Sequence, residues 1–268
     1  MKFIRLIAVV WFSSVVAAQT EEPARPAEGI SDNSFLVEEA YNQEAGVVQH
    51  IFTALWSYDR QPGSDERGWD FSYTPEVPLF SQRHQLSFTL PYSFPSGHSE
   101  NDWGDILLNY RLQALFEGDS LPAFSPRFSL ILPTSSGSDE LGYQINLPVS
   151  KILADRWTAH FNAGATLLPD TNGRDLVGYN LGASIIYAAT PTFNLMLELV
   201  GNWDEETTAT GGIDRNFAAV ISPGVRYAFN RANGAQYVVG LGFPVGLTRD
   251  TPDFGVFLYG SIEYAFRK

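Results

Sequence analysis

The feature that most constrains the fold is a hydrophobic period of two residues that persists over most of the chain. In segment 156–168, Trp157 and Phe161 belong to an apolar set that alternates with a small or polar set containing His160 and Asn162. Such alternation places apolar side chains on one face of a β-strand and polar side chains on the other. About twelve segments of this type occur, separated by clusters of Gly, Asn, Asp, Ser and Pro: 47–58, 68–77, 83–93, 103–116, 123–133, 142–152, 156–168, 177–188, 192–203, 216–229, 235–247 and 253–266.

The connections between these segments alternate in length. Short turns are expected at 153–156, 188–192 and 230–235, and longer polar loops at 58–68, 94–102, 168–176 and 204–215. Short turns on one side and long loops on the other are typical of an up-and-down barrel. An even number of strands places both termini on the short-turn side, which is periplasmic in outer-membrane barrels.

Aromatic residues lie at or near the ends of the predicted strands. They are Trp56, Tyr58, Trp69, Tyr92, Trp103, Trp157, Tyr187, Trp203, Tyr227, Phe229, Tyr264 and Phe266. Girdles at two membrane interfaces explain this placement, whereas a soluble sandwich would bury its aromatics in mid-strand. Segments near ten residues also suit a tilted membrane span. The sequence therefore predicts an all-β fold, a transmembrane up-and-down antiparallel β-barrel of about 12 strands over 47–268. A soluble β-sandwich or an exported soluble barrel is the alternative.

Segment 102–116, DWGDILLNYRLQALF, fits two periods. Leu108, Leu112 and Leu115 recur at helical spacing, but Ile106, Leu108 and Tyr110 also alternate at period two. A lone helix in a barrel wall would leave backbone groups without hydrogen bonds in lipid. We therefore predict a strand here.

The N-terminus resembles a secretory signal. Lys2 and Arg5 precede a short apolar run that ends in small residues, so we predict a signal peptide at 1–18, cleaved after Ala18. A retained anchor helix is the alternative. Residues 19–46 are predicted to form a periplasmic arm, or a short helix capped by Ser31 or Asp32.

Composition excludes several functions. The chain has no cysteine, so neither disulfides nor thiolate metal sites are available. The formal net charge of −13 argues against nucleic acid as a partner. No phosphate loop, nucleophile elbow or zinc motif occurs. His98 and Ser99 are adjacent in a loop, but this alone does not form a catalytic set. We predict no enzyme activity, no cofactor and no metal.

If the apolar set faces lipid, the alternate set faces the lumen. The candidate lumen-lining residues are Asp105, Asn109, Arg111, Arg127, His160, Glu198, Arg226 and Glu263. Their charges either cross-link the wall through ion pairs or line a narrow aqueous route. A barrel of about twelve strands is wide enough for a small-solute channel, and the arm at 19–46 could supply a partial plug.

Three segments resemble a known family. They are GDILLNYRLQALF, SPRFSLILPTSSG and NLPVSKILADRWTAHFNAGATLLP. They are similar to the outer-membrane family named for the MetA pathway of phenol degradation, whose members are described as transporters. The matching positions are Gly104 with Asp105, Pro133 with Thr134 and Gly137, and His160 with Asn162. The resemblance implies an outer-membrane barrel that passes small compounds, hydrophobic or aromatic ones among them, and it implies no catalytic residues.

The sequence thus predicts passive transport through the outer membrane of a Gram-negative bacterium. The expected partners are outer-membrane lipid, a small-molecule solute and the barrel assembly machinery, which reads a terminal aromatic residue. Here Phe266 is followed by Arg267 and Lys268, which displaces that signal by two residues. A closed structural or partner-binding barrel is the first alternative, and an outer-membrane lipid hydrolase using the 98–99 pair is a distant one.

Overall fold

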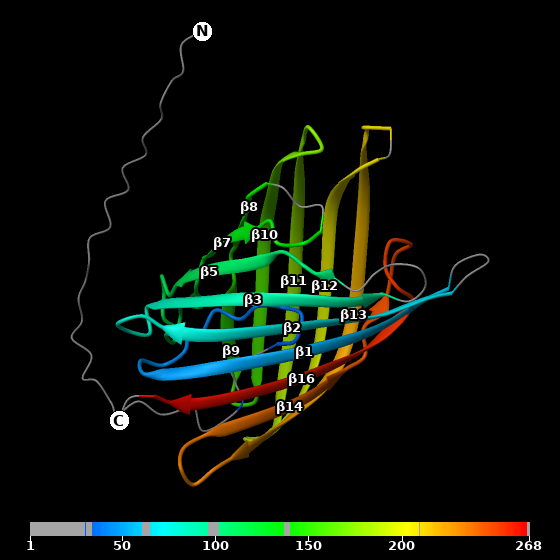
Figure 1. The fold of residues 1–268 in the computed structure, drawn as a ribbon. Helices are drawn as coiled ribbons and strands as arrows, with labels where there is room; N and C mark the ends of the chain where they lie inside the picture. Colours follow the sequence, from blue (N-terminus) through cyan, green and yellow to red (C-terminus); the bar gives the residue numbers. More distant parts are fainter. Residues whose placement is uncertain are drawn as a thin grey trace.

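A single antiparallel sheet closes on itself to form a barrel. The computed structural model describes residue 30 and residues 34–60, 65–95, 102–136, 140–208 and 210–266. Its strands follow the order β11-β12-β13-β14-β16-β1-β2-β3-β5-β7-β8-β10, and β10 pairs with β11 to complete the circle (Figure 1). β1 lies between β2 and β16, so the first and last strands of the barrel are neighbours.

The sixteen strands form a wall that is twelve strands around. They are β1 (Val47–Asp59), β2 (Glu66–Pro78), β3 (His84–Pro95), β4 (Asp102–Trp103), β5 (Ile106–Leu112), β6 (Ala123–Phe124), β7 (Arg127–Leu132), β8 (Gly142–Asn146), β9 (Val149–Ala154), β10 (Trp157–Thr171), β11 (Arg174–Thr190), β12 (Phe193–Thr207), β13 (Ile213–Asn230), β14 (Gln236–Gly242), β15 (Val245–Gly246) and β16 (Phe254–Ala265). Consecutive short strands share one place in the wall: β4 with β5, β6 with β7, β8 with β9, and β14 with β15.

Proline interrupts three of these split strands. Pro126 lies between β6 and β7, Pro148 between β8 and β9, and Pro244 between β14 and β15. Proline has no N–H to donate to a neighbouring strand, so the ladder breaks where it stands. The fourth interruption, between β4 and β5, falls at Gly104 and Asp105.

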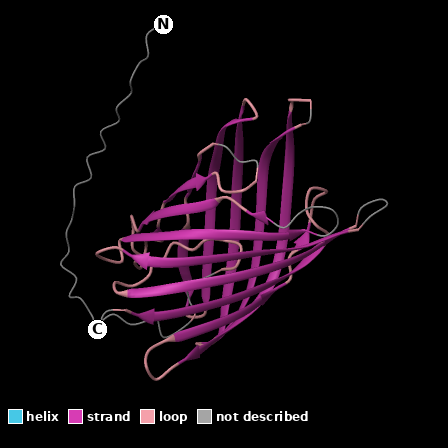
Figure 2. Cartoon of the chain, viewed as in Figure 1, coloured by secondary structure: helices cyan, strands magenta, loops and turns pink. Residues whose placement is uncertain are grey.

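The two faces of the wall differ as the alternation predicts. On β10, His160 and Asn162 are 2% and 4% exposed, whereas Phe161 between them is 50% exposed on the outside. On β12, Glu198 is buried and its neighbours Leu197 and Leu199 are exposed. The predicted all-β barrel of about 12 strands is confirmed. The described residues contain no helix, and hence none long and apolar enough to cross a membrane (Figure 2).

The ambiguous segment 102–116 is a strand, but a shorter one than predicted. β5 ends at Leu112; the alternation continues to the buried Gln113, but Leu115, which belongs to the same inward set, is exposed. The predicted segment 103–116 therefore ends early as a strand. The ring of Phe116 instead lies 4.9 Å from the guanidinium carbon of Arg83.

Two of the predicted long loops are wrong. β10 continues to Thr171 and β11 starts at Arg174, so 168–176 is a tight hairpin. β12 and β13 likewise extend through most of 204–215 and pair from Asp204 to Ile213. Figure 1 shows these two hairpins projecting beyond the rest of the barrel. Polar residues mark these ends because the strands continue there outside the apolar band, not because the strands have ended.

Several predictions fall on residues outside the described part of the chain. They are the signal peptide at 1–18, the caps Ser31 and Asp32, the loop residues His98 and Ser99, Gly137 of the family pattern, and the terminal Arg267 and Lys268.

The outward face gives a test of the membrane placement. Leu197→Lys puts a charge in the middle of the outward face of β12, and Thr207→Lys puts it on the same face at the strand end. In lipid, we expect the first to lower the free energy of unfolding by about 2–4 kcal/mol and the second by about 0–1 kcal/mol. Denaturant unfolding of the protein folded into liposomes measures both. Equal costs would contradict a lipid-facing position for Leu197.

Candidate functional site

The N-terminal segment that precedes β1 runs inside the barrel. We call residues 34–46 the arm. Beside it, Ile30 N donates to Pro191 O at the β11–β12 turn (3.2 Å). At its far end, Val47 N donates to Glu44 O (3.0 Å) as the chain enters β1. The arm contains bends and one turn but no helix, so the short helix predicted within 19–46 does not form in the described residues.

Glu198 holds the start of the arm. Its Oε1 accepts from the backbone N–H groups of Phe35 (3.1 Å), Leu36 (2.8 Å) and Val37 (3.0 Å). Next to it, Ser34 Oγ lies 2.7 Å from Ser184 Oγ on β11. Three consecutive N–H groups on one carboxylate oxygen form an anion-binding concavity, which satisfies backbone donors that have no strand partner.

The ring of Phe35 packs against wall glycines, which have no side chain to block it. A Cβ added to Gly240 would lie 2.4 Å from Phe35 Cζ, and one added to Gly224 would lie 2.9 Å from Phe35 Cε2. Phe257 and Tyr259 flank the ring with centroid distances of 5.4 Å. Glycine is required at these positions because any side chain would occupy the space of the ring.

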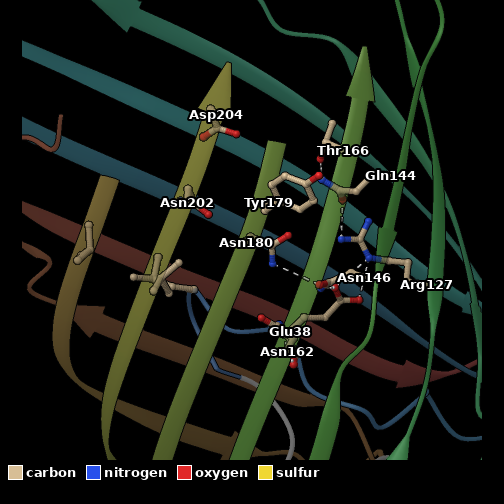
Figure 3. A pocket seen from close by; sticks show the side chains of 13 residues that line it. Glu38, Arg127, Gln144, Asn146, Asn162, Thr166, Tyr179, Asn180, Asn202 and Asp204 are labelled. Carbon is tan, nitrogen blue, oxygen red and sulfur yellow. Dashed lines mark hydrogen bonds and ion pairs between the residues drawn. The ribbon is translucent and has the colours of Figure 1, made fainter. Parts of the chain in front are cut away.

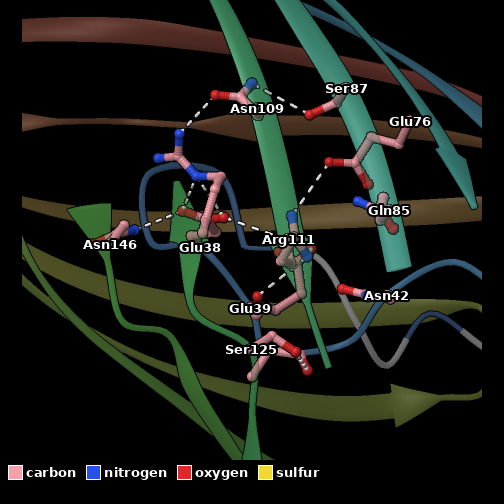
Figure 4. Close-up of polar contacts among 12 residues, drawn as sticks. Glu38, Glu39, Asn42, Glu76, Gln85, Ser87, Asn109, Arg111, Ser125 and Asn146 are labelled. Carbon is pink, nitrogen blue, oxygen red and sulfur yellow. Dashed lines mark hydrogen bonds and ion pairs between the residues drawn. The ribbon is translucent and has the colours of Figure 1, made fainter. Parts of the chain in front are cut away.

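An ion-pair cluster holds the middle of the arm. Glu38 receives two hydrogen bonds of 2.9 Å from Arg127 Nε, one to each carboxylate oxygen, and Asn146 Nδ2 donates to its Oε2. Arg111 Nε lies 3.4 Å from Glu38 Oε1. Figure 4 shows Glu38 between the β5 and β8 sides of the barrel, with Arg111 and Asn146 pointing toward it.

Arg111 links the arm to a second wall strand. Its guanidinium pairs with Glu39 (3.4 Å) and with Glu76 on β2 (3.2 Å), and it also donates to Tyr41 O (3.0 Å). Arg111 is 4% exposed. Breaking one partner of such a buried cluster is costly because a charge is left unpaired.

Neutral side chains hold the end of the arm. Ala40 N donates to Ser150 Oγ (2.7 Å), and Ala40 O accepts from Gln113 Nε2 (2.7 Å) and Ser125 Oγ (2.8 Å). Gln43 N donates to Gln85 Oε1 (2.8 Å). The arm thus contacts side chains from β1, β3, β5 and β7–β12, which places it in the lumen.

Two cavities flank the arm. One of about 400 Å³ is lined on the β7–β13 side by residues that include Arg127, Asn146 and Asn202 (Figure 3). The other, of about 250 Å³, lies against β1–β5 and β16. Leu36, Glu38 and Arg127 line both. The contact between arm and wall at Glu38 therefore separates them.

The surroundings of Glu38 favour its ionised form. Burial alone would raise the pKa of its carboxyl, but the charges of Arg127 and Arg111 and the hydrogen bonds from Asn146 and Arg127 outweigh burial and hold the pKa below its ordinary value of 4.5.

The structure brings most of the predicted lumen residues to the arm or near it. Arg111, Arg127 and Glu198 bind it directly, and Asn109 accepts from Arg127 Nη1 (2.9 Å). His160 is buried, and its Nδ1 lies 2.7 Å from Ser150 Oγ, the atom that accepts from Ala40 N.

Three of the predicted residues lie away from the Glu38 cluster. Arg226 and Glu263 are buried on the inner face of β13 and β16, where their strand neighbours include Asn194 and Gln236. Asp105 lies between β4 and β5 and accepts from Thr134 N and Ser135 N at 3.0 and 2.8 Å. Asp105 thus braces the loop after β7.

The partners on the arm were missed by the sequence analysis. The alternation of strand residues says nothing about Glu38, Glu39 and Phe35, because they lie outside the alternating region. The usable signal was the presence of Arg111 and Arg127 on an inner face, since buried guanidiniums require carboxylates. In the described residues, no group of three or more acidic or histidine side chains is placed to hold a metal ion.

The barrel is similar to solved outer-membrane proteins. The COG4313 outer membrane channel from Pseudomonas putida F1 matches with a TM-score of 0.65 and 16% identity, over 84% of this chain and 98% of that one. The NanC porin matches with a TM-score of 0.50 and 7% identity over 81% and 98%. The translocator domain of the autotransporter NalP from Neisseria meningitidis matches with a TM-score of 0.50 and 12% identity over 82% and 88%. At these identities the likeness establishes the fold: that of outer-membrane β-barrels.

No family model and no curated protein matches the sequence. The resemblance to the phenol-degradation family therefore remains a prediction.

The glycine patch under Phe35 gives a test of arm docking. Gly240→Val fills the space of the ring, and such overpacking costs about 1–3 kcal/mol. Because the chain has no cysteine, maleimide labelling of Ser34→Cys reports arm release directly. We expect the labelling rate to rise about tenfold or more, since about 1.4 kcal/mol corresponds to a factor of ten. The control is Gly260→Val, where an added Cβ meets nothing within 4 Å. Equal rates in both variants would contradict the docking of Phe35.

Proposed function

We propose that this chain is an outer-membrane channel for passive passage of small solutes, exported by the signal peptide at 1–18, and that the arm closes its lumen at rest. The observation that carries the proposal is the pair of cavities of about 400 and 250 Å³ separated by the Glu38 contact. Movement of the arm would join them. The polar inner face, with Asn109, Gln144 and Asn202 beside the charges, suits hydrated solutes.

The fold similarity to an outer membrane channel supports the proposal without naming a solute. The family resemblance adds hydrophobic or aromatic compounds as solutes to test first. A closed structural barrel is the competing function, and it is supported by the number of hydrogen bonds that hold the arm. Flux separates the two, because a structural barrel conducts neither with the arm docked nor with it released.

A disulfide lock tests the role of the arm. Ser34 Oγ and Ser184 Oγ lie 2.7 Å apart, a gap that a disulfide of about 2.05 Å bridges with a small adjustment. We expect oxidised Ser34→Cys/Ser184→Cys to show low conductance in planar bilayers, and reduction to restore openings. Ser34→Cys alone, treated with the same oxidant, is the control. Equal conductance before and after reduction would rule out the arm as the closing element.

The ionisation of Glu38 predicts a pH effect. Because its docked pKa lies below 4.5, the ion pairs stabilise the docked arm fully above the ordinary pKa, and this stabilisation is lost as pH falls through the lowered value. We expect conductance to rise only once the pH falls below that ordinary value. Glu38→Gln lacks the titrating group, so its conductance should already be high at pH 7 and change less on acidification. Identical pH profiles for the two proteins would exclude Glu38 as the cause.

A further inference from the structure

The carboxylate of Glu38 occupies a site built from three wall side chains. Arg127 Nε, Arg111 Nε and Asn146 Nδ2 all converge on it, from three different wall strands. None of these donors belongs to the arm. The wall therefore carries a carboxylate-binding site whose present occupant is a residue of the same chain.

Arg127 depends on this occupant more than Arg111 does. Among the described residues, Glu38 is the carboxylate that forms an ion pair with Arg127, whereas Arg111 also pairs with Glu39 and Glu76. The other donors of Arg127 go to the neutral oxygens of Asn109, Ser129 and Gln144. If the arm leaves without replacement, Arg127 loses its counter-charge in a half-buried position.

A solute that carries a carboxylate would remove this penalty. We propose that a small monocarboxylate competes with Glu38 for Arg127, Arg111 and Asn146, and that this exchange releases the arm. The proposal rests on the proposed function and names the solute class. One carboxylate replaces another, so the charge balance around the two guanidiniums is the same before and after the exchange.

The larger cavity provides room for such a solute next to the site. It holds about 400 Å³, and Arg127 and Asn146 are part of its lining. Leu36, Val200 and Val220 line the same cavity and offer apolar contact to the rest of the molecule. Asp204 is also in the lining, which favours a solute with a single negative charge.

Binding measurements test the competition. Benzoate is the probe, and benzamide is its neutral isostere. If Glu38 is a competitor, Glu38→Gln and Glu38→Ala should bind benzoate about tenfold or more tightly than the natural chain. In the natural chain, Glu38 occupies the site in most molecules and so lowers the apparent affinity for benzoate. Arg127→Gln should abolish this gain when combined with Glu38→Ala.

The matched control for loss of one carboxylate is Glu205→Gln. Glu205 pairs with Arg215 near the outer end of the β12–β13 hairpin, away from the arm. We expect its benzoate affinity to equal that of the natural chain. If Glu38→Gln and Glu38→Ala bind benzoate no more tightly than Glu205→Gln, the competition does not exist.

Release of the arm is a separate readout. The maleimide labelling rate of Ser34→Cys should rise several-fold in benzoate but not in benzamide at equal ionic strength, and Glu38→Ala should remove the difference. Equal rates in the two probes would overturn the exchange. If none of the proteins conducts, the proposed function fails, while the binding comparison still decides the competition. Conduction without any benzoate effect would overturn this inference alone.

Discussion

The ion-pair cluster of Arg111, Arg127 and Glu38 is the interaction on which the interior arrangement depends. Two guanidiniums on the inner face of a closed wall cannot remain without counter-charge, because removing an ion from water costs far more than a neutral hydrogen bond returns. Glu76 supplies one carboxylate from the wall, and the arm supplies Glu38 and Glu39. The docking of the arm against β5, β7 and β8 follows from this need.

The remaining contacts provide hydrogen-bond partners for the backbone of the arm. An extended segment that pairs with no strand leaves its N–H and C=O groups to be satisfied by side chains. Glu198 accepts three N–H groups, and Gln113 binds both the N–H of Asn42 and the C=O of Ala40. The polar inner face therefore acts as a set of backbone partners for the arm. This accounts for buried amides and hydroxyls such as Gln85, Ser125 and Ser150, which bind the backbone of the arm.

The sequence predicted the wall well because strand alternation is local. The inner positions of His160 and Asn162 follow from their neighbours alone. The hairpin at 168–176 was mistaken for a loop because Asp170 and Asn172 are turn formers, and both do take positive φ there, at 51° and 52°. The arm could not be predicted, since Phe35 to Val37 and their acceptor Glu198 are more than 160 residues apart in the chain. The local pattern predicted a short helix within 19–46, and these long-range contacts overrode it.

The wall is complete without the arm, which is what makes a moving arm compatible with a stable barrel. β1 pairs with β16 from Val47 to Tyr58 and with β2 from Gln49 to Asp59. Before Val47, the bond from Phe266 N to Gly46 O (2.8 Å) ties only the last residue of the arm to the end of the sheet. The described arm contributes no strand to the sheet, and its contacts with the wall are made largely through side chains. Local openings cost least where a segment shares few contacts with the cooperative unit. Undocking the arm would therefore break the ion pairs of Glu38 and the three backbone hydrogen bonds to Glu198, but it would leave the strand pairing of the twelve-stranded wall intact.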